Sequence, residues 1–171
     1  CKEKGIESPD QRKTLLQFLH DLGIVLWFDK LKYYNTQVLN PRWLTNGVYR
    51  IINSKSIAQE EGYLRLNQLD DILNKKQYED DELRHHYPES KFLFIMKIMQ
   101  EFELCYELEE EKYMIPDLLA IQECDTSDFD YDGALTFEMH YDFLPPAVMP
   151  RFMVQLHERI QPNQQWRTGV V

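Results

Sequence analysis

Apolar residues recur along this 171-residue chain with two different periods. Spacings of three and four residues predict amphipathic helices, whereas strict alternation with polar residues predicts strands that have one apolar face. The helical spacing occurs over residues 10–22, 41–52 and 88–102, and again between Val148 and Ile160. The clearest alternation is the run Leu135, Thr136, Phe137, Glu138, Met139, His140, Tyr141, Asp142 and Phe143. The chain therefore combines helices with short strands.

The stretch from His20 to Asn53 predicts a packing unit of helix, strand, strand and helix. Gly23 stands where a chain leaves the helical conformation. The wholly apolar run 24–28 predicts a short strand buried on both faces, and 37–39 predicts a second strand. Asn40 is a strong N-cap and Pro41 suits the first helical position. The helix that follows is expected to bury Leu44, Val48, Ile51 and Ile52.

Further elements follow in order along the chain. The pattern predicts a strand over 62–66, a short helix capped by Asn67, a charged surface loop over 74–86 and a hairpin over 103–115. The helix over 88–102 has a predicted buried stripe of Phe92, Ile95, Met96, Met99 and Phe102. The last helix is expected to bury Val148, Phe152, Leu156 and Ile160 and to end at Pro162, before a strand that begins at Gln165. The predicted class is α+β: a winged-helix-like helical module with small β-hairpins (1–133), followed by the start of a second α+β unit (134–171).

Charge and cysteine content narrow the range of partners. The formal net charge is −10, and three cysteines are spread over the chain. A surface that binds nucleic acid through phosphates needs a basic face, so this composition disfavours nucleic acid. One cysteine must stay unpaired, which favours a reducing, cytoplasmic compartment. We predict no membrane span, because the chain lacks an apolar run of sufficient length.

The sequence offers little chemistry. It contains neither a glycine-rich phosphate-binding motif nor a nucleophile elbow, so we predict no catalytic residue, cofactor or metal site. Asp128, Asp130, Asp132 and Gly133 match the start of a calcium-binding loop, but Met139 occupies the position of its bidentate glutamate. A divalent-metal module therefore remains a third alternative. Cys105 is interpreted as a small buried apolar residue.

Three stretches resemble the COR domain of Roco proteins, the family of bacterial Roco GTPases and leucine-rich-repeat kinases. They are residues 19–28 with 38–52, the hairpin end Tyr113–Leu119, and residues 141–157. The resemblance implies a first COR half up to residue 133 and a second half from residue 134, of which the chain is expected to hold only the beginning, because both of its ends look cut. It also implies a Roc GTPase domain as partner in the same chain, and a homodimer formed mostly through the second half.

The leading hypothesis is a non-enzymatic regulatory domain that couples the adjacent Roc GTPase to dimerisation and output. The resemblance maps the GTPase contact to Tyr141, Phe143, Leu144 and Pro145. The alternative, since Tyr141 and Phe143 lie on the apolar face of the predicted strand, is that they belong to a core. The alternative function is a winged-helix module that binds nucleic acid. The triple glutamate at 109–111, on the tip of the hairpin, argues against that function, because it would be repelled by phosphates.

Overall fold

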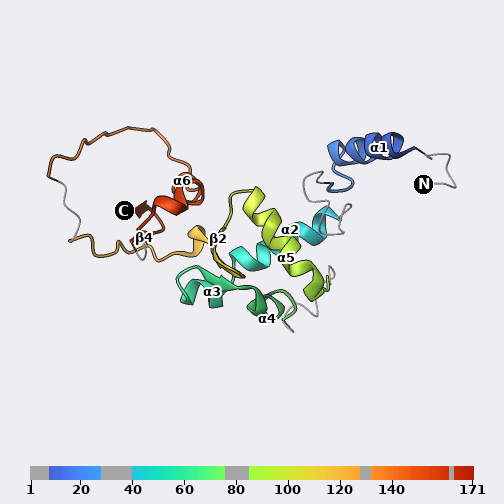
Figure 1. Cartoon of the computed structure of the whole chain (residues 1–171), viewed down its shortest axis with the longest axis horizontal. Coiled ribbons are helices and arrows are strands. Elements are labelled where there is room, and N and C mark those ends of the chain that lie inside the picture. The colour runs from blue at the N-terminus through green and yellow to red at the C-terminus, as the bar shows by residue number, and fades with distance from the viewer. Residues whose placement is uncertain (1–7, 28–39, 76–84, 128–131, 162–163) are drawn as a thin grey trace.

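The computed structural model of the chain describes residues 8–27, 40–75, 85–127, 132–161 and 164–171 (Figure 1). The predicted strand at 37–39, most of the predicted loop at 74–86 and the first two aspartates of the calcium-like motif lie outside the described residues.

Helix α1 spans Pro9–Asp21, close to the predicted 10–22. Ser8 and Gln11 form a capping box, because each side chain accepts a hydrogen bond from the other's backbone N–H (3.1 and 3.4 Å). None of the α1 side chains is buried. Its apolar stripe is therefore left at least partly exposed by the rest of the described chain, and α1 extends away from α2 to α5 in Figure 1.

The prediction of a strand buried on both faces at 24–28 is wrong for its described part. The N–H of Gly23 donates to the carbonyl of His20 at 2.8 Å, and the N–H of Ile24 donates to the carbonyl of Leu19 at 3.0 Å. These two bonds close the end of α1, with Gly23 at a φ of +69°. Ile24 is consequently still part of the helix terminus and is exposed, Leu26 is partly buried against the main core, and Trp27 is the first buried residue of the run.

The central part of the chain consists of short helices and one antiparallel sheet. Its helices are α2 (Pro41–Ile52), α3 (Lys55–Gln59), α4 (Leu69–Leu73) and α5 (Phe92–Glu101), with 3-10 turns η3 (Leu66–Gln68), η5 (Glu89–Lys91) and η6 (Pro116–Leu118). The strands β1 (Tyr63–Arg65), β2 (Tyr106–Glu109) and β3 (Lys112–Met114) form a sheet in the order β1-β3-β2. The predicted α+β class and the hairpin are confirmed, while the winged-helix comparison stays a prediction.

The predicted helix caps are confirmed in one case and wrong in another. Asn40 caps α2, since its side-chain oxygen accepts from the N–H of Arg42 at 2.9 Å. Asn67, the predicted cap of the next helix, lies inside η3, and α4 begins without a side-chain cap. The reason is that α4 continues directly from η3, whose carbonyls already accept the N–H of Leu69.

Helix α5 lies at the centre of the main core. Six of its ten residues are buried: Phe92, Phe94, Ile95, Met96, Ile98 and Met99. They belong to one apolar cluster with residues of α2, α4 and the sheet, among them Leu44, Ile51, Leu73 and Tyr113. Phe102, predicted to be buried, is half exposed, because α5 ends at Glu101 and Glu103 turns the chain with a φ of +57°.

Tyr87 connects three parts of this module and is completely buried. Its hydroxyl donates to the carbonyl of Trp43 at 2.8 Å, and its ring lies 5.3 Å from the guanidinium carbon of Arg50. Asn74 brackets its backbone, accepting from the Tyr87 N–H at 3.0 Å and donating to its carbonyl at 2.9 Å. Gly47 on α2 leaves room for the ring, because a Cβ there would lie 2.8 Å from Tyr87 Cε1.

An ion pair joins α5 to the hairpin and predicts acid sensitivity. Lys97 Nζ donates to Glu107 Oε2 at 2.8 Å. Burial raises the pKa of Glu107, but the hydrogen bond and charge of Lys97, together with hydrogen bonds from the Glu111 backbone and Tyr113, outweigh it and hold that pKa below its ordinary value. Since the folded pKa is the lower one, the pair stabilises the fold above about pH 4.3, the ordinary glutamate value, and this contribution is lost as pH falls through the folded pKa. We expect the thermal midpoint of Glu107→Gln to decline less than that of the wild type in this acid range; parallel curves would contradict the assignment.

The C-terminal part forms a second packed group. It comprises α6 (Val148–Leu156), the 3-10 turn η7 (His157–Arg159) and a two-stranded ladder of β4 (Gln165–Trp166) and β5 (Gly169–Val170). The sequence predicts a strand without a partner from Gln165 onward, but the chain turns back and pairs with itself. Met153 packs in a small cluster with Tyr106, Met114 and Leu119.

The predicted buried face of α6 is wrong for Val148 and Phe152, whereas Leu156 is partly buried and Ile160 packs against the small cluster as expected. Met153 is 0% exposed, whereas Val148 and Phe152 are 42% and 45% exposed. The helix carries two adjacent apolar stripes, and the sheet contacts the one that includes Met149 and Met153. Among the described residues, no helix has the length and apolar character needed to cross a membrane.

Candidate interaction surface

Residues 134–145, here called the exposed segment, precede α6 and are all exposed. The structure shows no strand there, which corrects the prediction for 135–143. Within the described chain, no backbone hydrogen bond is made by residues 134–144. A strand requires a neighbouring strand to satisfy its N–H and C=O groups, and the described chain supplies none at this position.

The apolar side chains of the exposed segment point to no core in the described chain. Leu135, Phe137, Met139, Tyr141 and Phe143 are 60–81% exposed. Five large apolar side chains in consecutive alternate positions are unusual on a free surface, and such a patch is typical of an interaction site. The next turn leads directly into α6, whose Val148 and Phe152 are also partly exposed and enlarge the apolar surface.

The four predicted contact residues lie together at the end of the exposed segment. Tyr141, Phe143, Leu144 and Pro145 are all exposed. The Tyr141 hydroxyl is 3.8 Å from Met139 Sδ, and the Pro145 carbonyl accepts from the N–H of Val148 at 3.1 Å. The latter bond fixes the position at which the segment enters α6. Their contact with a GTPase stays a prediction, and no described part of the chain buries Tyr141 or Phe143.

The chain on either side of the exposed segment is held in place by contacts with the hairpin region and with each other. We call this contact region the seam; it is formed by Glu103, Tyr106, Leu119, Ala120, Arg151, Met153, Gln155, His157, Gln165 and Arg167. The rings of Tyr106 and His157 stack at 4.7 Å, and the Tyr106 hydroxyl donates to Gln165 Oε1 at 2.8 Å. Arg167 fixes the start of the stretch, since its Nε donates to the Leu119 carbonyl and its N–H donates to the Ala120 carbonyl, at 3.2 and 2.8 Å.

A second set of polar contacts fixes α6 against the turn after α5. Glu103 accepts a hydrogen bond from Gln155 Nε2 at 2.8 Å and lies 3.7 Å from Arg151 Nε. Met153 of α6 is also buried in the small cluster with Tyr106 and Met114 of the sheet, so apolar and polar contacts together hold α6.

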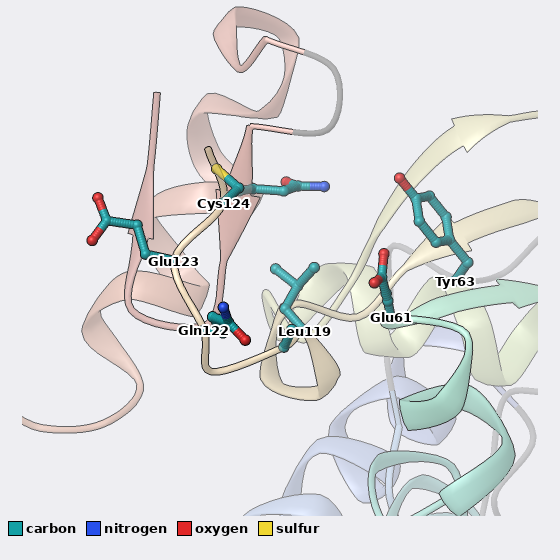
Figure 2. Close-up of a pocket in the computed structure, with 8 residues that line it drawn as sticks. Glu61, Tyr63, Leu119, Gln122, Glu123 and Cys124 are labelled. Atoms are coloured by element: carbon teal, nitrogen blue, oxygen red, sulfur yellow. The ribbon is translucent and has the colours of Figure 1, made fainter. Parts of the chain in front are cut away.

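A shallow cavity of about 320 Å³ lies beside the seam (Figure 2). Glu61, Tyr63, Leu119, Gln122, Glu123 and Cys124 line it, together with Ala120 and Gln165. Its lining includes two carboxylates and no basic side chain.

Two further candidates for chemistry are Cys105 and the calcium-like motif. Burial raises the pKa of Cys105 to about 12, so its thiol is protonated and acts as the small apolar residue that the sequence predicts. Across the parts of the chain that the structure describes, no three His, Cys, Asp or Glu side chains gather in a way that could hold a metal ion. Of the calcium-like motif, Asp132 and Gly133 alone fall within those parts.

Sequence reasoning misses the residues that build the seam and the Tyr87 contacts of the core. The pattern places Tyr87 and Asn74 in or beside a loop, and it gives His157 no partner. One signal was available at the start of β2. Cys105 and Tyr106 are adjacent and both buried, and since successive side chains of an extended chain point to opposite sides, both faces must be covered there.

Comparison with known proteins gives consistent results along the chain. The family model described as "C-terminal of Roc, COR-A domain" matches residues 1–119, and that described as "C-terminal of Roc, COR-B domain" matches residues 132–171. A Roc-COR-CHAT protease of Runella zeae is 29% identical over 176 aligned residues, covering all of this chain and 17% of that protein. The probable serine/threonine-protein kinase qkgA of Dictyostelium discoideum is 25% identical, again over the whole chain and 12% of its own length.

A solved structure is also similar. Roco2 RocCORdC of Methanosarcina barkeri, bound to GDP, has 38% sequence identity and a TM-score of 0.55 over 66% of this chain and 33% of that chain. The chain thus spans less than a fifth of the length of these two curated relatives and a third of the similar structure.

Proposed function

The chain belongs to the C-terminal-of-Roc (COR) domain family of Roco proteins, and from this premise we propose that its exposed segment docks on the Roc GTPase domain of the same polypeptide. COR is a regulatory domain of Roco proteins and lies next to the Roc GTPase. The observation that carries the proposal is the row of large apolar side chains at 135–143, which no described part of this chain covers.

The proposed mechanism is a packing event without bond chemistry. Docking would cover Tyr141, Phe143, Leu144 and Pro145, and it would order the entry into α6. Since the seam fixes α6 to the hairpin through Met153 and the Tyr106–His157 stack, a shift of the GTPase surface would be passed to the three-stranded sheet and the main core. The fragment itself is proposed to have no enzymatic activity.

The division into two COR halves is part of the proposal. We place the first half at 1–133 and the second from 134, with homodimerisation and coupling to output assigned mostly to the second half. In this division the small cluster around Met153 joins the two halves, because Tyr106, Met114 and Leu119 come from the first half and Met153 from the second. Sedimentation of the full-length protein with and without residues 134 onward would test the dimer assignment.

Replacing Phe143 with alanine is expected to weaken docking without unfolding the chain. The Phe143 side chain is 74% exposed, so its removal leaves no cavity in the described fold. Burial of a phenylalanine at a docking surface contributes about 2 kcal/mol, which corresponds to a roughly 30-fold higher Kd for the added Roc domain. Isothermal titration calorimetry measures the Kd, and circular dichroism measures the thermal midpoint.

The matched control is Tyr49→Ala on α2, another aromatic side chain with similarly high exposure, 65%. It should leave the Kd unchanged. Equal Kd values for the wild type and Phe143→Ala would sink the contact assignment.

A further inference from the structure

The exposed segment lies in a part of the chain with an extreme charge distribution. Between Tyr113 and Pro150 there are eight acidic residues and neither lysine nor arginine, so most of the net charge of −10 arises in this stretch. Glu138 and Asp142 alternate with the exposed apolar side chains of the segment itself. His140 Nε2 lies 3.5 Å from Glu138 Oε1, and both side chains are exposed.

The extended backbone separates these two kinds of side chain. Successive side chains of an extended chain point to opposite sides, so when Met139, Tyr141 and Phe143 face a partner, Glu138 and Asp142 point to the outside of the contact. Side chains at the rim of a contact add little affinity, but they accelerate association with a surface of opposite charge. The apolar side chains, buried at the centre, determine the rate of dissociation.

We propose that the exposed segment recognises an apolar cleft with a basic rim, and that this cleft lies on the Roc GTPase domain. The inference rests on the proposed function and specifies the chemistry of the partner surface. Lysine and arginine side chains at the rim would complement Glu138 and Asp142, while the cleft would take the aromatic side chains of Tyr141 and Phe143. A docking surface with an acidic rim of its own would be repelled by this stretch at low ionic strength, and a rim without charge would gain no faster association.

The test compares association and dissociation rates by surface plasmon resonance, with the Roc domain of the full-length protein immobilised. For the wild type, the association rate constant should fall about tenfold or more between about 50 mM and about 500 mM NaCl. The double variant Glu138→Lys with Asp142→Lys should associate about tenfold more slowly at the lower salt, should lose most of the salt dependence, and should keep its dissociation rate within about twofold. Phe143→Ala should show the reverse, a faster dissociation and little change in association.

The control keeps the net charge change and moves its position. Asp71→Lys with Glu110→Lys brings the net charge from −10 to the same −6 at exposed residues of α4 and the hairpin tip. This variant should associate like the wild type to within about twofold. An equal slowing in both double variants would overturn the inference, because net charge alone would then explain it.

Other outcomes separate this inference from the proposed function. Binding that is insensitive to salt and to both lysine substitutions overturns the basic rim but leaves docking intact. Absence of Roc binding at every salt concentration overturns both. Self-association of the chain in sedimentation velocity that disappears in the Glu138→Lys, Asp142→Lys variant would also overturn it, since the segment would then bind a second copy.

Discussion

Tyr87→Ala is expected to lower the free energy of unfolding by about 3–5 kcal/mol, the range for removal of a large aromatic side chain from a packed core. The ring is completely buried against Trp43, at 4.8 Å between ring centroids, and it covers the buried Arg50. Its loss leaves a cavity, and it leaves the guanidinium without its aromatic neighbour. Urea unfolding monitored by circular dichroism measures the change.

Two variants separate the parts of this effect. Tyr87→Phe removes only the hydroxyl that donates to the Trp43 carbonyl, so it should cost about 1 kcal/mol. Tyr49→Ala, at the exposed position on α2, should change stability by less than about 0.5 kcal/mol. A Tyr87→Ala variant that unfolds at the wild-type urea concentration would show that the contacts of this ring do not hold the module together.

Gly47 provides a more specific test of the same packing. Alone, Gly47→Ala should destabilise by about 1–3 kcal/mol, because its methyl group would meet the Tyr87 ring at 2.8 Å. In the Tyr87→Ala background the same change should be neutral or stabilising by up to about 1 kcal/mol, since alanine is the better helix former. Additive effects of the two substitutions would contradict a direct contact between α2 and the ring.

Met153→Asp is expected to detach α6 from the sheet, at a cost above about 3 kcal/mol for the docked state, because it places a carboxylate in a buried apolar cluster. Detachment should remove hydrogen-exchange protection from α6 and β4–β5 while α5 keeps its protection. Docking of the Roc domain should weaken as well, since the proposed mechanism depends on α6 being fixed.

Phe152→Asp is the matched control, one residue away on the same helix. Phe152 is partly exposed and lies outside the seam, so the substitution should change stability by less than about 1 kcal/mol and leave α6 protected. If Phe152→Asp detached α6 and Met153→Asp did not, the face assigned by the sequence pattern would be the correct one.

The contrast between these two residues shows where the sequence stops being informative. Both stripes of α6 are apolar at helical spacing, and periodicity identifies the helix without identifying which stripe meets the sheet. The same holds for residues 135–143: their alternation is strand-like, but a strand exists only with a partner that satisfies its backbone. The described chain does not supply that partner, so the segment is extended and exposed instead.

Local signals determined the helices and turns of this protein from the sequence alone. The Ser8 capping box, the Asn40–Pro41 start and the Gly23 terminus act within four residues of the groups they satisfy, so α1 and α2 begin and end close to where the sequence predicts. The apolar run at 92–99 likewise determined the central core helix. The stretches that resemble COR domains were also sufficient to indicate the family.

Only the tertiary structure decided which surfaces are covered. Tyr87 meets Trp43 from 44 positions away, Tyr106 meets Gln165 from 59 positions away, and Met153 rather than Phe152 packs on the sheet. Such contacts depend on the relative positions of whole elements, which no short-range pattern encodes. For that reason the sequence could place an apolar strand-like segment at 135–143, but only the folded chain showed that no described part of it covers these side chains.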